Sequence, residues 1–409
     1  MKQELIKKYA HLIAATGVNV KQGQPVIIQA SVDQHAFVTM VMEECYKQGA
    51  SWVRVEWSDQ AQTRLHYQYQ SLETLSKLPE WREKQLQQLV DDHPCRICIV
   101  STDPAGLAGI DQDKMQKADR ATLPITRKYL NESAPYCQWT IAAVPSPAWA
   151  MKVFPGVSAE EAVEKLWKAI LATCYVTEDN DPVAFWTTRR ETAKVRADWL
   201  KEKAFDTLTY KSSNGTDFMA KLVPGSNWAG GGASLEDGTA YVPNLPTEEI
   251  FTTPQRGCAE GTLVSTKPLS YQGQLIENFS ITFKDGKAVS WKAEKGEDVL
   301  GKIITMDEGA AYLGELALVP VSSPISQSGI LFYTTLFDEN ASCHVALGRG
   351  FGHCIPNWKN LSEAERNALC NTSMIHVDFM VGAPDMTITG WKDGVPTPIF
   401  VNGEWAEEV

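Results

Sequence analysis

The sequence predicts an α/β N-terminal domain with a parallel sheet, followed by an α+β C-terminal domain. Helical and extended patterns alternate through the first half, whereas short extended runs separated by turn signals fill the chain beyond Thr207. The length of 409 residues also favours more than one domain. We place the domains at 1–180 and 181–409, with the boundary inside a helical connector at about 155–205.

Three extended runs alternate with helical segments in the first half. The helical segments are predicted from apolar residues at helical spacing, which stop at glycines such as Gly17 and Gly49. This order is typical of βαβ units, whose strands are parallel. The elements are a helix over 2–16, a strand at 25–29, a helix over 33–48, a strand at 52–57, helical stretches to about 90 and a strand at 95–100.

The connector is predicted from helix-start signals. Ser158-Ala-Glu-Glu161 is a capping-box pattern, and Asp181-Pro182 begins a second helix that runs to about Lys203. Beyond this helix, Asn-Gly and Asp-Gly pairs mark tight turns between short strands. These pairs are Asn214-Gly215, Asp237-Gly238, Asp285-Gly286 and Asn402-Gly403.

Charge and cysteine usage narrow the class of protein. The net charge is −12 and the pI about 5.2, which disfavours nucleic acid as a partner because phosphate binding needs clustered Lys and Arg. The N-terminus does not read as a signal peptide, and no apolar run reaches the ~18 residues of a membrane span. Nine scattered cysteines predict reduced thiols, so we expect a cytoplasmic protein without membrane or nucleic-acid partners.

Two motifs are weak signals. Gly230-Gly-Gly232 lacks the spacing of a phosphate loop, so a hairpin or close backbone approach is the better interpretation. Cys95-x-x-Cys98 lies inside an apolar run and has no second pair to complete a zinc site, so a strand core is favoured.

The segment Ile375-His-Val-Asp-Phe-Met-Val381 alternates as a strand. Its apolar side chains face one side, and His376 and Asp378 share the other, because residues two apart on a strand point the same way. A histidine and a carboxylate in parallel suit a metal pair, but a solvent-exposed strand face explains them equally well.

Glu315 favours the metal interpretation. It is the only charged residue in the run Ala310–Pro320, and a carboxylate in apolar surroundings is costly unless it is paired, hydrogen-bonded or metal-bound. Glu339 and His344 are five apart, so a turn at Asn340-Ala341 would have to bring them together.

A fourth acidic group, Glu248-Glu249, precedes the apolar pair Ile250-Phe251. Four carboxylate or histidine clusters in the last part of the chain resemble a dinuclear metal centre. Two ions need bridging carboxylates and terminal histidines, and oxygen-rich sites of this kind suit zinc, cobalt or manganese.

At these segments the sequence resembles the thermophilic-aminopeptidase family (aminopeptidases T and S), which are dinuclear metallo-aminopeptidases. The resemblance covers nearly the whole chain, and four motifs in order are more specific than any one. They are Asn244-Leu-Pro-Thr-Glu-Glu-Ile-Phe-Thr-Thr-Pro254, Tyr312-Leu-Gly-Glu-Leu-Ala-Leu-Val319, Leu336-Phe-Asp-Glu-Asn-Ala-Ser-Cys-His-Val-Ala-Leu-Gly348 and His376-Val-Asp378.

The resemblance implies a C-terminal metal-binding domain that holds two divalent ions (Zn, Co, Mn or Mg). It implies Glu248 as a candidate general base. The sequence departs from the family at Phe351, where a tyrosine usually stands near the metals, and His353 is a candidate substitute for the lost hydroxyl. The implied metal ligands are Glu249, Glu315, Glu339, His344, His376 and Asp378.

The function implied is hydrolysis of N-terminal amino acids from peptides with a free N-terminus, by a metal-activated water in a cytoplasmic homodimer. An alternative is a non-catalytic metal- or peptide-binding relative whose activity was lost with the tyrosine. A third interpretation, a thiol enzyme that uses Cys343 beside His344, requires a bend because adjacent strand residues point apart.

Overall fold

A computed structural model describes residues 2–407 of the chain. The chain forms two compact units. The first contains the residues up to Thr188 and the segment Gly232–Pro246, and the second contains Arg189–Gly231 and the residues from Thr247 onward. The sequence analysis placed one boundary at 180/181 and did not predict that a later segment belongs to the first unit. That boundary stays a prediction.

The first unit holds the helices and the parallel strands. Its helices are α1 (Gln3–Leu12), α2 (His35–Lys47), α3 (Gln60–Tyr69), α4 (Leu72–Leu75), α5 (Glu80–Asp92), α6 (Gln112–Ser133), α7 (Pro147–Val153) and α8 (Ala159–Thr173), with a π-helical turn η1 (Ile13–Gly17) and a 3₁₀ turn η2 (Val32–Gln34). Its strands are β1 (Val26–Ser31), β2 (Val53–Ser58), β3 (Cys95–Val100), β4 (Trp139–Ala143), β8 (Ala233–Ser234), β9 (Ala240–Tyr241) and β10 (Asn244–Leu245). Helix α9 (Pro182–Lys203) runs across the division between the units.

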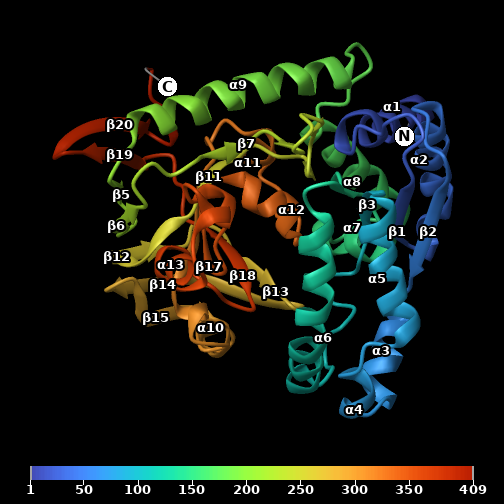
Figure 1. The fold of residues 1–409 in the computed structure, drawn as a ribbon, viewed down its shortest axis with the longest axis horizontal. Helices are drawn as coiled ribbons and strands as arrows, with labels where there is room; N and C mark the ends of the chain where they lie inside the picture. Colours follow the sequence, from blue (N-terminus) through green and yellow to red (C-terminus); the bar gives the residue numbers. More distant parts are fainter. Residues whose placement is uncertain (1, 408–409) are drawn as a thin grey trace. The chain divides into compact units, whose positions relative to one another are not determined.

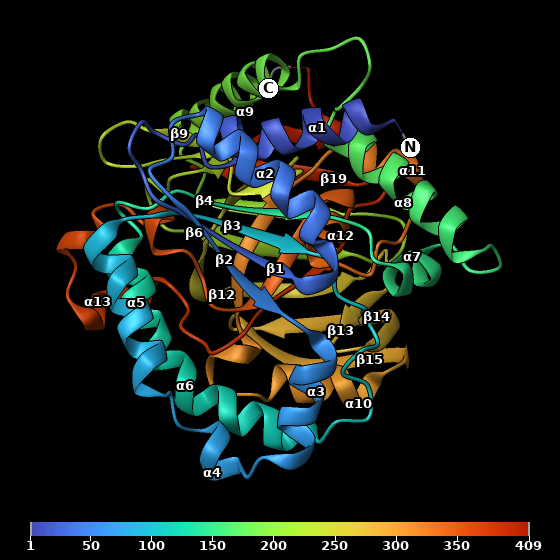
Figure 2. The same ribbon diagram turned by 90° about the vertical axis from the view of Figure 1, so that its right-hand side faces the viewer.

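The five-stranded sheet of this unit has the order β10-β4-β3-β1-β2, and all its pairs are parallel, as predicted. Helices α1 and α2 lie on one side of it and α5 and α6 on the other (Figures 1 and 2). Because both faces are covered, successive residues of β1 are buried, and Ile27 packs with Leu86 and Leu89 of α5 and Tyr129 of α6. This packing fixes the side of the sheet on which α5 lies.

Two elements of the first unit carry weak sequence signals. Helix α6 contains Pro124, which usually breaks a helix, and it buries few of its residues. Strand β4 is short and follows two buried residues rather than a turn signal. Neither element was predicted, because both depend on packing against β3 and α5.

The second unit is mainly antiparallel. Its strands are β5 (Thr207–Lys211), β6 (Asp217–Leu222), β7 (Ala229–Gly230), β11 (Ile250–Thr252), β12 (Pro254–Val264), β13 (Leu269–Tyr271), β14 (Gln274–Lys284), β15 (Lys287–Lys295), β16 (Leu313–Leu318), β17 (His344–Gly348), β18 (His376–Met380), β19 (Thr387–Lys392), β20 (Val395–Val401) and β21 (Glu404–Trp405). Its shorter helices are α10 (Glu297–Ile304), α11 (Pro324–Ser328), α12 (Thr335–Asp338) and α13 (Glu363–Leu369), with 3₁₀ turns η3 (Gly309–Ala311), η4 (Glu339–Ala341), η5 (Gly352–Cys354) and η6 (Trp358–Asn360).

Two sheets build this unit and share one apolar core, which confirms the predicted α+β character. One has the order β13-β14-β12-β6-β5-β19-β20-β21, with β15 beside β14, and the other has the order β18-β17-β16-β11-β7. Across the chain, all four predicted Asn-Gly and Asp-Gly turns join paired antiparallel strands. No helix among residues 2–407 is long and apolar enough to cross a membrane.

Candidate metal centre

The predicted ligands lie on neighbouring strands of the five-stranded sheet. Glu249 directly precedes β11, Glu315 lies on β16, His344 begins β17, and His376 and Asp378 lie on β18. These strands are consecutive in the sheet order, so side chains far apart in the sequence become neighbours. The sheet therefore gathers four of the sequence clusters on one surface.

The register places small residues opposite most of the predicted ligands, although His344 also lies opposite Met380. Ala346 pairs with both Glu315 and Asp378. Ala317 lies opposite His344, and Gly348 lies opposite His376. Residues directly opposite in antiparallel strands share a face, so these small side chains leave room among the larger ligands.

The other face of the same strands belongs to the core. Leu316, Val345, Val377 and Phe379 are all buried in the apolar cluster of this unit. The alternation predicted for 375–381 is therefore confirmed: apolar side chains enter the core, and His376 and Asp378 face the other way.

A β-bulge in β16 decides the direction of Glu315. Leu313 pairs with Leu347, but Glu315 pairs with Ala346, which is a register shift of one residue. A shift of one residue moves a side chain to the opposite face of a sheet. Gly314 permits the bulge, since a Cβ built there would lie 2.3 Å from the carbonyl oxygen of Arg349.

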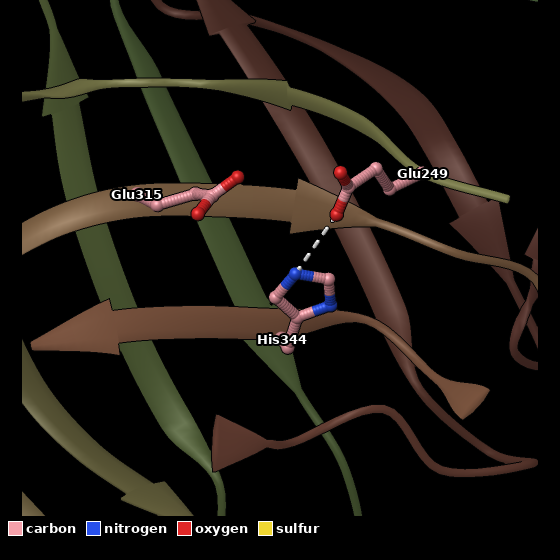
Figure 3. A group of neighbouring side chains, drawn as sticks. All are labelled: Glu249, Glu315 and His344. Atoms are coloured by element: carbon pink, nitrogen blue, oxygen red, sulfur yellow. Dashed lines mark ion pairs between the residues drawn. The ribbon is translucent and has the colours of Figure 1, made fainter. Parts of the chain in front are cut away.

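The ligand atoms form two groups that share Glu315. One group is Glu249, Glu315 and His344, drawn in Figure 3, and the other is Glu315, His376 and Asp378; within each, the candidate ligand atoms lie within 4.8 Å of one another. His344 Nε2 lies 3.2 Å from Glu249 Oε2. His376 Nε2 lies 2.9 Å from Glu315 Oε2 and 3.4 Å from Asp378 Oδ1. A carboxylate common to two groups is the arrangement that bridging requires.

Backbone carbonyls orient both imidazoles. His344 Nδ1 lies 3.2 Å from the carbonyl oxygen of Ser342, and His376 Nδ1 lies 2.6 Å from that of Arg349. A carbonyl only accepts hydrogen bonds, so each Nδ1 carries the proton. Each Nε2 therefore faces the carboxylates and is available as a metal ligand.

Two buried atoms fit a metal better than any protein partner. His344 Nε2 and Asp378 Oδ1 are buried and make no hydrogen bond within the described chain, although each lies near an oppositely charged group. Buried polar atoms of this kind normally have a partner. The mixed set of carboxylates and imidazoles is one that divalent first-row ions accept, so these residues fit the implied ions.

Glu339 lies close to both groups. The turn predicted at Asn340-Ala341 is the 3₁₀ turn η4, which leads from Glu339 toward His344 at the start of β17. Burial raises the pKa of Glu339 well above its usual range, and the charges of Glu249 and Asp378 raise it further. The proximity of these carboxylates is consistent with a sixth ligand.

In the metal-free chain, protons would balance the clustered charge. Burial raises the pKa of Glu315 to about 7, against the opposing effect of the His376 contact. Burial lowers the pKa of His344, but contact with Glu249 and the charges of Glu315 and Asp378 outweigh it and raise the pKa to about 10. These protons must leave when a cation enters.

We therefore expect metal affinity to rise, and the stability of the chelated protein to fall, as the pH increases. Between the ordinary glutamate pKa of 4.5 and about 7, folded Glu315 holds a proton that the unfolded chain has lost. His344 extends the same imbalance from 6.5 to about 10. Because the folded state binds more protons in this window, raising the pH favours unfolding of the metal-free protein.

Calorimetric zinc titration and urea unfolding between about pH 5 and pH 9 test this expectation, with about a tenfold change in metal affinity per pH unit for each proton displaced. Metal-loaded protein is the control, because the ion replaces the protons. A dissociation constant that does not change with pH would contradict the assignment.

Glu248 and Glu249 have different partners. Glu249, 9% exposed, belongs to the first ligand group. The Glu248 side chain is buried and forms an ion pair with Arg189, while its backbone N–H donates to Asn340 Oδ1 at 2.7 Å. This geometry favours Glu249 over Glu248 as a ligand, and the base role of Glu248 stays a prediction.

Asn340 connects two acidic segments of the site. It is fully buried, and besides accepting from the Glu248 backbone it donates from Nδ2 to the carbonyl of Leu336 at 3.2 Å and toward Glu339 Oε1 at 3.4 Å. One side chain thus links the turn that carries Glu249 with the turn that carries Glu339.

We expect Asn340→Ala to weaken metal binding by about 10- to 100-fold, as is usual when a partner that orients metal ligands is removed. Calorimetric titration of chelated protein measures the effect. The exposed Asn360→Ala is the matched control. Unchanged metal affinity in a folded Asn340→Ala variant, verified by circular dichroism, would refute this role.

Phe351 lies beside His376, one of the predicted metal ligands. Its ring packs edge-on against the His376 ring, with 4.9 Å between the ring centroids. The centroids of the Phe251 and His353 rings lie 5.0 Å and 5.6 Å from that of Phe351. Its backbone N–H donates to Thr253 Oγ1 at 2.7 Å, which fixes this segment. Desolvation by the surrounding protein lowers the pKa of the His353 imidazole, although part of this side chain reaches the surface. Phenylalanine at position 351, where the family usually has a tyrosine, therefore places an apolar ring at the edge of the site.

The remaining sequence interpretations have structural outcomes. Cys343 is buried in the apolar core, and burial raises the pKa of its thiol to about 12, so this thiol is poorly suited to act as a nucleophile. Cys95 and Cys98 lie on β3 as free thiols, as the strand-core interpretation predicted. A Cβ at Gly230 would lie 2.5 Å from the carbonyl oxygen of Glu249, so close backbone approach explains that glycine.

Gly314 and Arg189 were not singled out from the sequence, and Asn340 was predicted only as part of a turn. Gly314, Asn340 and Arg189 all act through backbone or ion-pair contacts with ligand-bearing segments. Gly314 and Asn340 lie directly beside predicted ligands in the sequence, which is a usable signal. Arg189 lies in a polar helix far from them, and no local pattern marks it.

Comparison with known proteins gives consistent matches. A family model described as thermophilic metalloprotease (M29) matches residues 2–405. Aminopeptidase AmpS of Bacillus subtilis (strain 168) is 43% identical over 407 residues, which covers 98% of both chains. Aminopeptidase T of Thermus thermophilus is 35% identical over 402 residues, with the same coverage of 98% of each chain.

Solved structures agree. Wild-type AmpT from Thermus thermophilus matches with a TM-score of 0.90 at 35% identity, covering 99% of both chains. A 2,5-dihydroxypyridine dioxygenase from Pseudomonas putida KT2440 matches with a TM-score of 0.52 at 12% identity, which is a likeness of fold alone. The match over the full sequence and the agreement in structure show that this chain belongs to the M29 family of thermophilic metalloproteases.

Proposed function

We propose that this protein is a metal-dependent aminopeptidase that hydrolyses N-terminal amino acids from peptides, with two divalent ions held by the six predicted ligands. The observation that carries the proposal is that two buried ligand groups share Glu315. The matched relatives are named aminopeptidases, so the non-catalytic alternative has no support.

When bound, two divalent ions supply a water of lowered pKa as nucleophile and polarise the scissile carbonyl. Glu249, Glu315 and His344 would hold one ion and Glu315, His376 and Asp378 the other, with Glu339 as the proposed sixth ligand. The backbone carbonyls behind the two histidines hold their Nε2 atoms toward the carboxylates.

Glu248 is the proposed general base. In this role it accepts the proton of the attacking water and returns it to the leaving amine, while Arg189 and Asn340 hold its position. Glu248→Gln should retain metal and lose about 10²- to 10⁴-fold in kcat. A variant with lost metal and an unchanged kcat in excess metal would instead make Glu248 a ligand.

The free α-amine of a peptide would bind a metal or an acidic side chain of the site, which limits cleavage to the first residue. The test is turnover of amino-acid p-nitroanilides after dialysis and addition of zinc, cobalt, manganese or magnesium, together with metal content by elemental analysis. N-acetylated p-nitroanilides are the matched controls and should not be cleaved. Turnover of acetylated substrates, or turnover without metal, would overturn the proposal.

The finer expectations are part of the same proposal. We expect a homodimer, which sedimentation equilibrium would test, and a cytoplasmic location, which fractionation of cells would test. The native metal follows from the elemental analysis, because the ligand set is compatible with several divalent ions.

A further inference from the structure

The first unit contains a hollow of about 660 Å³ that the proposed peptidase reaction does not use. Its walls come from the ends of β1, β2 and β3 and from the beginning of α5, and none of its lining residues is a proposed metal ligand. The volume is in the range of small-molecule sites, which is about 300–1,000 Å³.

The hollow lies where the topology of the sheet favours a ligand. From β1 the chain crosses to β2 on one side, whereas from β3 it crosses to β4 on the other, so β1 and β3 flank a switch point. Residues of the second halves of both strands line the hollow, Gln29 and Ala30 of β1 and Cys98 to Val100 of β3. In open α/β sheets, ligands bind outside the carboxyl ends of the strands at such a point.

A charged network forms the polar wall. Glu56 Oε1 accepts from Arg54 Nη2 at 3.2 Å, and Glu56 Oε2 accepts from Gln29 Nε2 at 3.1 Å and from Arg82 Nη1 at 3.3 Å. Two guanidinium groups face this single carboxylate, so the polar wall carries a net positive charge. Both carboxylate oxygens already accept hydrogen bonds. The Arg54 Nε atom is buried and has no hydrogen-bond partner within residues 2–407.

Trp81 forms the apolar wall. It lies in the first turn of α5, is 63% exposed and lines the hollow beside Arg82. Tryptophan and arginine are both enriched at binding hot spots, where the ring supplies apolar area and the guanidinium supplies directed hydrogen bonds.

We propose that this hollow binds a small carboxylate with an aromatic or apolar body, such as an N-blocked amino acid or the C-terminal residue of a peptide. The guanidinium groups of Arg54 and Arg82 would take the carboxylate, and Trp81 would cover the body. A nucleotide is disfavoured because no glycine lines the hollow, whereas phosphate sites at strand ends use glycine-rich turns. A cation is disfavoured because Glu56 already has three donors.

The test uses the full metal-loaded protein and N-acetyl-L-phenylalanine, whose blocked amine removes it from the aminopeptidase reaction. Calorimetry gives the affinity, and tryptophan fluorescence reports on the site. N-acetyl-L-phenylalaninamide, which lacks the carboxylate, should bind at least about tenfold more weakly. Arg82→Gln should weaken the acid by about tenfold or more and leave the amide unchanged. Trp81→Ala should weaken both compounds.

Matched controls separate the hollow from the rest of the chain. Lys84→Gln on the same helix and Tyr69→Ala, both exposed and outside the hollow, should bind the acid as the wild type does. His344→Ala should also bind it normally, so that failure of this site and failure of the proposed peptidase function are distinguishable. Binding that is lost in His344→Ala but retained in Arg82→Gln would overturn the proposal.

A longer blocked peptide, acetyl-Ala-Ala-Ala-Phe, distinguishes the two sources of the carboxylate. If this peptide competes with N-acetyl-L-phenylalanine, the ligand class is peptide C-termini. If the peptide does not bind while N-acetyl-L-phenylalanine does, the ligand class is small free acids. Absence of saturable binding by both compounds at up to about 1 mM would overturn the proposal.

Discussion

Glu315→Ala is expected to abolish peptidase activity, with a fall in kcat/KM of at least about 10³, and to remove at least one equivalent of metal. Glu315 is the common member of both ligand groups, so its loss removes a ligand from each proposed ion. Steady-state kinetics with p-nitroanilides and elemental analysis measure the two effects. Glu363→Ala, an exposed glutamate of the same unit, is the control.

Stability should change in opposite directions with and without metal. In chelated protein at neutral pH, Glu315→Gln removes a buried carboxylate whose pKa is raised to about 7, so the variant should be more stable than chelated wild type. In excess zinc the wild type should be the more stable, because it gains more from metal binding. Full metal stoichiometry together with full turnover in either Glu315 variant would show that the ligand assignment is wrong.

Phe351→Tyr is expected to raise kcat by about 10- to 10³-fold with little change in KM, by analogy with other oxyanion donors. The ring centroid of Phe351 lies 4.9 Å from that of the predicted ligand His376, with the rings edge-on, so a hydroxyl on this ring would be placed near the proposed metal site. A hydrogen bond made only in the transition state raises kcat without tightening substrate binding.

Neighbouring rings provide the controls for this prediction. Phe251→Tyr adds the same hydroxyl to a ring 5.0 Å away and should leave kcat unchanged. If His353 or a metal already stabilises the oxyanion, Phe351→Tyr will leave kcat unchanged or lower it. If the stabilising group is the imidazole, His353→Ala will lower kcat. An unchanged kcat in Phe351→Tyr would reject the idea of a missing hydroxyl.

Local sequence patterns were sufficient for much of the fold. The parallel sheet follows from strands and helices that alternate at βαβ intervals, and β3 lies at the predicted residues 95–100. The hairpins of the second unit follow from Asn-Gly and Asp-Gly pairs, whose Asp285 and Asn402 adopt the positive φ that these turns require. Helix α6 was missed because Pro124 lies inside it and most of its residues are polar.

Several candidate residues of the site could also be recognised from the local sequence. His376 and Asp378 share a strand face because the period of a strand is two, and Glu315 is unusual as the only charge in an apolar run. Short sequence segments are enough to recognise such residues, since the signal depends on one residue and its immediate neighbours.

What only the tertiary structure decided is which of these segments meet, and on which face. The order β18-β17-β16-β11 brings the ligands together through pairing of strands that are distant in the sequence. A one-residue bulge at Gly314 turns Glu315 away from the apolar face and toward Asp378. The sequence alone predicted the candidate donors of the centre, and long-range strand register decided that they converge, because register depends on pairing partners that no local pattern encodes.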